Sequence, residues 1–285
     1  MLILLDGAMG TELQRRGVPT GLPLWSARAL IENPDAVRRI HLDYMNAGAG
    51  VLTTNTFRTH RRSLAKAGLA DRTPELTRLA VYLAKEAAAQ ADRPVRIAGS
   101  VSPLEDCYRP DLSPGKADDE FLEISEWLME GGCDFLLIET MNNIAELRSA
   151  VRAAQKLGAE FWTSVNPSND DPLSLLSGES VLEALRVCEG EGAASFLVNC
   201  AGMPVIERAV SEVGKRAKVP FGGYANNGEA DETVGWRFDC ELSPNEFAEH
   251  CVRLADAGAT RIGGCCGTSP EHIYAAAEAL DVKSA

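Results

Sequence analysis

Short apolar segments recur along the chain at fairly even intervals, and most of them are apolar on successive residues. Strands of a parallel sheet that is covered on both faces show this continuous pattern, whereas half-exposed strands alternate between apolar and polar residues. The pattern therefore predicts eight buried parallel strands. They span residues 2–6, 50–56, 96–102, 135–140, 161–166, 196–200, 219–224 and 261–267.

Amphipathic helices are expected between these strands. Val37, Ile40, His41 and Tyr44, for example, follow the i, i+3, i+4, i+7 spacing that places side chains on one helix face. A capping residue followed by proline marks four helix starts, and glycine marks three helix ends. The starts are Asn33-Pro34, Thr73-Pro74, Ser243-Pro244 and Ser269-Pro270, and the glycines are Gly48, Gly158 and Gly258.

Eight strands that each precede a helix, with no long polar linker, predict a single α/β domain over residues 1–285, a closed (β/α)8 TIM barrel. An open dinucleotide-binding sheet is disfavoured, because residues 6–10 lack the third glycine of its phosphate-binding loop. Two connections that follow strands are long, 103–118 and 226–243. Both belong to the face where barrel active sites are built, so both are candidate lids.

The chain has 41 acidic and 28 basic residues and a net charge of -13. This balance argues against nucleic acid or an anionic membrane as the partner, because both require a clustered basic surface. No apolar run approaches the roughly 18 residues that cross a bilayer, and the apolar start at residues 1–5 is too short for a signal peptide. We therefore expect a cytoplasmic protein with reduced thiols that acts on small molecules.

The strongest chemical signal is the run Gly-Gly-Cys-Cys-Gly-Thr at residues 263–268, at the end of the last predicted strand. Adjacent cysteines form a strained disulfide, and the flanking glycines let the backbone turn both sulfurs toward one point. Cys200 ends the sixth strand, close to the end of the eighth in a barrel. Three thiolates with one open position are typical of catalytic Zn²⁺, so Cys200, Cys265 and Cys266 are the predicted metal ligands. Three cysteines in helical contexts are interpreted as buried apolar side chains: Cys133, Cys188 and Cys251.

Polar residues also cluster at the predicted strand ends. Any one of them could be a turn residue, but Glu139 directly follows four apolar residues and must find a partner or water. Asp6 and Glu139 together suit an ammonium group, and backbone amides around Gly7 and Thr54 suit a carboxylate. These positions describe an amino-acid pocket. The other polar residues at predicted strand ends are Asn55, Thr56, Asn166, Tyr224 and Asn226.

These motifs give the sequence a clear family resemblance. It resembles the homocysteine S-methyltransferase family, whose barrel also occurs in betaine–homocysteine methyltransferase and at the front of cobalamin-dependent methionine synthase. The matching stretches are residues 6–11, 53–57, 98–100, 138–140, 199–200 and 263–268, which follow one another over nearly the whole chain. Residues 163–167 and 224–228 depart from the family pattern: the first ends in Asn-Pro, and the second reads Tyr-Ala-Asn-Asn-Gly in place of Tyr-Pro-Asn-x-Gly.

The resemblance implies a zinc-dependent methyl transfer to the thiol of L-homocysteine, which gives methionine. Zinc would keep the thiol deprotonated, and a sulfonium such as S-methylmethionine or S-adenosylmethionine would supply the methyl group. The implied zinc ligands are Cys200, Cys265 and Cys266, and the implied homocysteine contacts are Asp6, Gly7, Thr54, Glu139 and Asn199. Candidates for the donor side or the open metal position are Tyr224, Asn226 and Trp236, with Glu229, Asp231 or Glu232 nearby.

Several alternatives stay open at the level of sequence. Betaine or a methylated corrinoid protein could replace the sulfonium, and selenocysteine could replace homocysteine as the acceptor. A ligand-binding barrel with a purely structural zinc is a different class of protein, and a redox-active dithiol pair is another. Metal content in a reducing buffer and methionine formation with a panel of donors distinguish these possibilities.

Overall fold

The computed structural model describes residues 1–114, 116–231, 235–238 and 240–282. Eight strands in it form one parallel sheet with the order β1-β10-β7-β6-β5-β4-β3-β2. A parallel bridge between Leu5 and Val51 joins the two outermost strands and closes the sheet into a barrel. The strands are β1 (Ile3–Leu4), β2 (Val51–Thr53), β3 (Arg96–Val101), β4 (Phe135–Met141), β5 (Phe161–Val165), β6 (Ser195–Gly202), β7 (Phe221–Asn226) and β10 (Arg261–Gly264).

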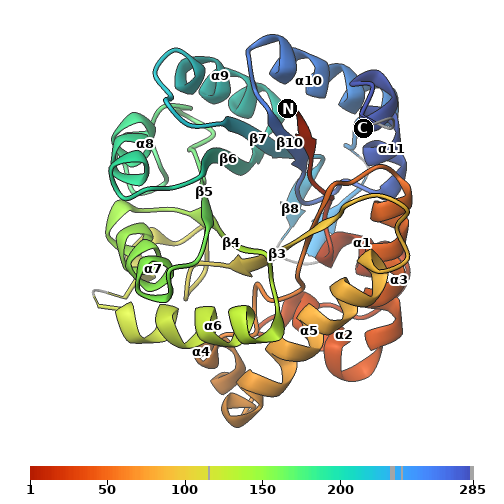
Figure 1. The fold of residues 1–285 in the computed structure, drawn as a ribbon, viewed down its shortest axis with the longest axis vertical. Helices are drawn as coiled ribbons and strands as arrows, with labels where there is room; N and C mark the ends of the chain where they lie inside the picture. The colour runs from red at the N-terminus through yellow and green to blue at the C-terminus, as the bar shows by residue number, and fades with distance from the viewer. Residues whose placement is uncertain (115, 232–234, 239, 283–285) are drawn as a thin grey trace.

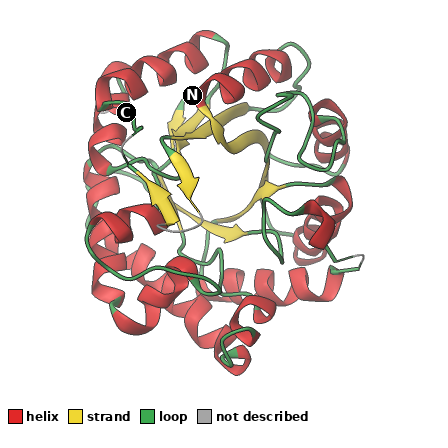
Figure 2. Cartoon of the chain, turned by 180° about the vertical axis from the view of Figure 1, so that it is seen from behind, coloured by secondary structure: helices red, strands yellow, loops and turns green. Residues whose placement is uncertain are grey.

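Helices surround these strands as an outer ring (Figure 1), which is the predicted (β/α)8 architecture. Seen from behind, the strands again form the inner layer and the helices the outer one (Figure 2). None of the helices in the described residues is both long and apolar enough to cross a membrane. The helices are α1 (Gly10–Arg15), α2 (Arg28–Glu32), α3 (Pro34–Asn46), α4 (Arg61–Ala65), α5 (Thr73–Ala88), α6 (Asp118–Gly131), α7 (Ile144–Leu157), α8 (Val181–Gly190), α9 (Met203–Gly214), α10 (Pro244–Asp256) and α11 (Pro270–Ala279).

Three of the four predicted helix caps are confirmed. The side chain of Asn33 accepts a hydrogen bond from the third residue of α3, and Ser243 and Ser269 form capping boxes at α10 and α11. The fourth was placed one residue late, because Thr73 is already the first residue of α5 and its hydroxyl donates to the Ala70 carbonyl. The glycine of α7 is also confirmed, since Gly158 ends that helix in the left-handed conformation.

Side chains of β4 alternate between two apolar cores. Phe135 and Leu137 belong to a small core inside the barrel, where the Phe135 ring lies 4.4 Å from that of Trp162. Leu136 and Ile138 belong to the larger core between the barrel and its helices. The period of two therefore directs the next residue, Glu139, inward above Leu137 at the barrel mouth. Apolar layers thus fill the barrel below the level at which the polar residues begin.

Three connections at the carboxyl ends of the strands are long. Residues 102–117, with a short 3-10 helix at Pro110–Leu112, and residues 227–243 are the two predicted ones. The second contains an antiparallel hairpin of β8 (Glu229–Asp231) and β9 (Gly235–Arg237), which the sequence pattern did not indicate. The third, residues 166–180 after β5, was also missed. The strand prediction at 261–267 was too long, because residues after Gly264 turn away from the sheet.

Candidate metal and substrate site

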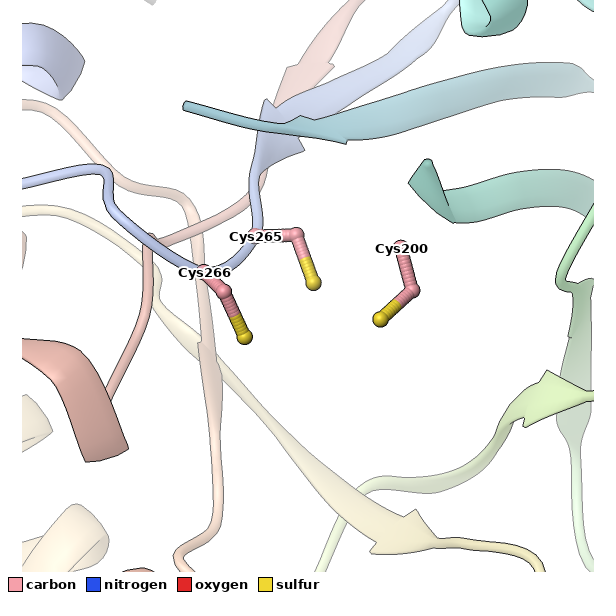
Figure 3. A group of neighbouring side chains, drawn as sticks. All are labelled: Cys200, Cys265 and Cys266. Carbon is pink, nitrogen blue, oxygen red and sulfur yellow. The ribbon is translucent and has the colours of Figure 1, made fainter. Parts of the chain in front are cut away.

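The sulfur atoms of Cys200, Cys265 and Cys266 lie within 4.8 Å of one another. Cys200 belongs to β6, and the other two follow β10; in the sheet only β7 separates these strands. Figure 3 shows the sulfurs of Cys265 and Cys266 on one side and that of Cys200 on the other, facing the same space. The structure therefore brings together the three thiols that the sequence predicted as metal ligands.

Close packing explains why glycines frame the cysteine pair. A Cβ atom on Gly264 would lie 2.3 Å from the Thr268 hydroxyl, and one on Gly267 would lie 1.5 Å from the Asn227 carbonyl oxygen. Gly267 also has a φ of +85°, in the region that glycine adopts without strain. The Cys265 amide donates to Ala225 O at 2.9 Å, which ties the turn to the end of β7. Substitution of either glycine would displace the two sulfurs.

Cys200 reaches the site because its strand bulges. Its φ is +63°, and the register between β6 and β7 shifts between Asn199 and Gly202. Thr140 on β4 shows the same left-handed conformation, with φ of +61°, beside a second register shift. Such a conformation costs a non-glycine residue on the order of 1–3 kcal/mol and is concentrated at functional sites, where it redirects side chains. The bulge in β6 turns Cys200 toward the barrel mouth, and the bulge in β4 lies directly after Glu139.

Asn199 connects these two bulges. Its amide oxygen accepts from the Thr140 N–H at 3.1 Å and from the Ser164 hydroxyl at 2.7 Å, and its amide nitrogen donates to the Thr140 hydroxyl at 2.8 Å. Asn199 is completely buried. These hydrogen bonds link the ends of three strands, and the contact of Asn199 with homocysteine stays a prediction.

This position gives Asn199 a testable structural role. Asn199→Ala leaves the buried Thr140 N–H without an acceptor, so we expect the free energy of unfolding to fall by roughly 1–3 kcal/mol. Urea denaturation measures this loss, and Ser164→Ala, which removes only one of the three bonds, should cost less. Unchanged stability together with a higher KM for homocysteine would contradict the supporting role and indicate a direct contact.

The three thiols influence one another's pKa values. Hydrogen bonds from the thiols of Cys107, Cys265 and Cys266 lower the pKa of Cys200, because they stabilise its thiolate. The same interaction with Cys200 raises the pKa of Cys265 and of Cys266. Cys200 is therefore the most readily ionised of the three thiols, and a bound metal ion would displace the thiol protons that remain.

The donor set fits a tetrahedral thiolate site. A Zn–S bond of about 2.3 Å places neighbouring sulfurs of a tetrahedral site about 3.8 Å apart, within the spacing of the three cysteines. Three sulfurs occupy three corners and leave one corner for a further ligand. Soft thiolate donors favour zinc over magnesium or calcium.

Two buried carboxyl groups lie at the same end of the barrel. Asp6 accepts from the Thr53 N–H at 2.7 Å and from the Thr53 hydroxyl at 2.8 Å. Glu139 accepts from the Ser100 hydroxyl and, at 3.1 Å, from the Tyr224 hydroxyl. Burial raises the pKa of Asp6 to about 7 and that of Glu139 to about 7, although these hydrogen bonds oppose the shift. Neither carboxyl forms an ion pair with a described residue, so a cationic ligand would supply the missing charge.

The other predicted homocysteine contacts, Thr54 and Gly7, differ in whether their hydrogen-bonding groups are free to bind a ligand. The Thr54 N–H donates to Ala98 O at 2.9 Å, and its hydroxyl accepts from the Ser100 N–H at 3.0 Å, so both groups are already engaged. Gly7 is closely packed, since a Cβ atom there would lie 2.7 Å from the Thr268 hydroxyl. Its amide has no hydrogen-bond acceptor among the described residues. Gly7 is therefore the better candidate of the two for a substrate carboxylate.

The candidate residues for the donor side differ in their surroundings. Tyr224 is buried beside Glu139, whereas Asn226, at the end of β7, has a side-chain oxygen without a partner among the described residues. Trp236 is buried and its indole N–H donates to Asn227 O at 3.3 Å, directly behind the cysteine turn. This contact supports a packing role for Trp236. Glu229 is exposed, and Glu232 lies outside the described residues.

Sequence reasoning missed two residues of the site, Cys107 and Tyr108. The Cys107 thiol is close enough to lower the pKa of Cys200, and the Tyr108 hydroxyl lies 3.2 Å from the Cys200 sulfur. Both belong to the connection 102–117, whose position on the active face was the one signal that could have identified them. The helical cysteines behave as predicted: Cys133, Cys188 and Cys251 are buried, and all eight cysteines are free thiols.

Comparisons with known proteins point to a single enzyme family. The sequence profile described as homocysteine S-methyltransferase matches residues 3–280. Homocysteine S-methyltransferase of Escherichia coli (strain K12) is 31% identical, with 96% of this chain and 94% of that protein covered. Selenocysteine Se-methyltransferase of Brassica oleracea var. italica is 27% identical, with 95% and 87% covered. The crystal structure of the metallated form of the homocysteine methyltransferase MmuM from Escherichia coli has a TM-score of 0.82 at 29% identity, with 96% of this chain and 95% of that chain covered. The chain belongs to the homocysteine S-methyltransferase family.

Proposed function

We propose that this protein transfers a methyl group from a sulfonium donor to the sulfur of L-homocysteine, with zinc held by Cys200, Cys265 and Cys266. One observation carries the proposal: three sulfurs converge at the barrel mouth, where two buried carboxyls form no ion pair with any residue that the structure describes. A ligand with a thiol at one end and an ammonium group at the other matches both halves of this site. Homocysteine has both groups.

The residues of the chain divide the work of binding. A zinc ion on the three thiolates would supply the positive charge that keeps the homocysteine sulfur deprotonated at neutral pH. Asp6 and Glu139 bind the ammonium group, and the Gly7 amide donates to the carboxylate. Tyr224 holds Glu139 in place through its hydroxyl. Burial of both carboxyls strengthens their attraction for the ammonium group.

The methyl transfer requires a good leaving group on the donor. The homocysteine sulfur forms a new bond to the methyl carbon, and the bond between that carbon and the sulfonium sulfur breaks. The bonding electrons leave with the donor, which becomes a neutral thioether, and no oxidant or reductant is needed. Three thiol groups and two buried carboxyls give the site an anionic character, which favours a positively charged donor.

Other features of the proposal follow from the same observations. Three sulfur ligands leave one metal position open, which favours catalysis over a purely structural zinc. The excess of acidic over basic residues argues against nucleic acid or an anionic membrane as a partner, so the proposed partners are small molecules. The proposed location is the cytoplasm, where the thiols of the site stay reduced. A selenol is chemically close to a thiol, and a Se-methyltransferase is among the relatives, so selenocysteine is the second acceptor to test.

The proposal is tested by methionine formation with a panel of donors. We expect the zinc-loaded protein to methylate homocysteine with S-methylmethionine or S-adenosylmethionine, and to do so more slowly with betaine or a methylated corrinoid. Selenocysteine replaces homocysteine in a parallel series. Methionine formation from betaine alone would overturn the sulfonium assignment, and no methylation with any donor would overturn the function.

A further inference from the structure

The connection between β3 and α6, residues 102–117, is fixed in place by buried polar groups of its neighbours. The Leu104 N–H donates to the carboxylate of Glu146 at 2.8 Å, and the Ser113 hydroxyl donates to the same carboxylate at 2.7 Å. Glu146 lies on α7 and is only 2% exposed. The buried side chain of Glu146 therefore holds the connection on both sides of its tip, the segment between Leu104 and Ser113.

Three more hydrogen bonds orient the tip itself. The Asn142 amide donates to Cys107 O at 3.0 Å, and the Arg58 guanidinium donates to Glu105 O at 3.0 Å. The Asp106 carboxylate accepts from the Tyr108 N–H at 2.9 Å, which forms a tight turn at that point. The first two anchors come from the segments after β4 and β2. The backbone next to Tyr108 is thus held from two sides of the barrel mouth.

This anchored tip places the Tyr108 hydroxyl 3.2 Å from the sulfur of Cys200. Cys200 is 6% exposed, whereas Tyr108 is 44% exposed, so the ring extends from the solvent to the buried sulfur. Tyr82 on α5 shows how an unconstrained phenol behaves here: it is 55% exposed and donates to a carboxylate on its own helix. The contact between Tyr108 and Cys200 instead joins two segments 92 residues apart.

We propose that Tyr108 is a positioning residue of the metal site and donates a hydrogen bond to the Cys200 sulfur when that sulfur ligates the metal. The inference rests on the proposed metal-dependent function and extends it to a residue outside the three thiols. A metal-bound thiolate has no proton, so the phenol is the donor of the pair, and the anionic acceptor strengthens the bond. The bond holds Cys200 on its left-handed backbone and withdraws part of the negative charge that three thiolates place on one ion.

The test compares Tyr108→Phe with the matched control Tyr82→Phe in titrations with Co²⁺, which reports on thiolate ligands through its absorption. Removal of a hydrogen bond to a metal ligand typically weakens metal affinity by about 10- to 100-fold, which we expect for Tyr108→Phe alone. The thiolate-to-cobalt charge-transfer band should also shift to longer wavelength, because the sulfur lone pair loses a stabilising donor. Tyr82→Phe should match the wild type in both measurements.

The outcomes separate this inference from the proposed function. Wild-type affinity and an unchanged band in Tyr108→Phe would overturn the role of Tyr108 while leaving the metal site intact. Weaker affinity with an unchanged band and a lower melting temperature of the metal-free protein would show that Tyr108 only supports the loop, which also overturns it. If the wild type itself binds no cobalt, the proposed function fails first, and the inference fails with it.

Discussion

Cys200→Ser, Cys265→Ser and Cys266→Ser are each expected to purify with almost no zinc and to lose methyl transfer by at least about 100-fold. Loss of a directly coordinating thiolate exceeds the 10- to 100-fold effect of losing a supporting contact, because two sulfurs cannot complete the site. Metal content by atomic emission and methionine formation measure the two losses. The three variants should be alike, since their sulfurs lie within 4.8 Å of one another.

The matched control is Cys240→Ser, which makes the same change at an exposed cysteine. It should keep full metal content and activity. Far-ultraviolet circular dichroism should be the same for all four variants and for protein treated with a chelator, because the apolar layers of the barrel do not include the metal. Full zinc and full activity in any one of the three variants would remove that cysteine from the proposed ligand set.

Asp6→Asn and Glu139→Gln are expected to keep zinc but to raise the KM for homocysteine by about 10- to 150-fold. A charge-assisted hydrogen bond to an ammonium group contributes roughly 1.5–3 kcal/mol, which corresponds to this range. The amides keep the shape of the acids, and an amide can still accept from the Thr53 N–H or face the hydroxyls of Ser100 and Tyr224. Steady-state kinetics with homocysteine measure the effect.

The pH dependence of KM gives a second measurement. With a pKa of about 7, the Asp6 carboxyl is mostly protonated at pH 6 and mostly ionised at pH 8. Binding of an ammonium group requires the ionised form, so the wild-type KM should fall as the pH rises through 7. Asp6→Asn should reduce this change in KM between pH 8 and pH 6 by about tenfold, while the pH dependence due to Glu139 and to the substrate thiol remains. Parallel pH profiles for the wild type and Asp6→Asn would contradict the assignment.

Stability provides the control for both carboxyl variants. A carboxyl group whose pKa is raised on folding contributes stability below its unfolded pKa, near 4, and loses that contribution as the pH rises through 7. Replacement by a neutral amide should therefore not lower the free energy of unfolding at pH 8. A simple thiol such as mercaptoethanol, which lacks the amino group, should be used equally by wild type and variants. Unchanged use of homocysteine by both variants would show that the amino group binds elsewhere.

The sequence was sufficient for the features that depend on local pattern. Continuous apolar runs identified all eight strands of the barrel, because each strand is buried on both faces. The pair Cys265-Cys266 was identifiable because its glycine frame reflects packing that permits no Cβ atom. Its meeting with Cys200 followed from barrel topology alone, which places β6 and β10 on either side of β7.

Other features depend on contacts that no local pattern encodes. Tyr108 lies in an irregular connection without periodicity, and only its distant anchors, such as Glu146, bring it to Cys200. The supporting role of Asn199 depends on the bulge at Thr140, on a different strand. The β8–β9 hairpin was missed because two strands of three residues are too short to show alternation.

The closure of the barrel has a consequence for its motions. Between β1 and β2 the backbone forms a single bridge, at Leu5 and Val51, and the side chain of Asp6 binds the Thr53 amide where a further rung of the ladder would lie. This seam is where the ring of strands has the fewest backbone links, so transient opening of the barrel should begin there. The proposed ammonium ligand engages the same carboxylate. A bound ligand would therefore hold Asp6 in place and keep β1 and β2 together. The amide of Thr53 would then exchange its proton with solvent more slowly in the complex than in the free protein.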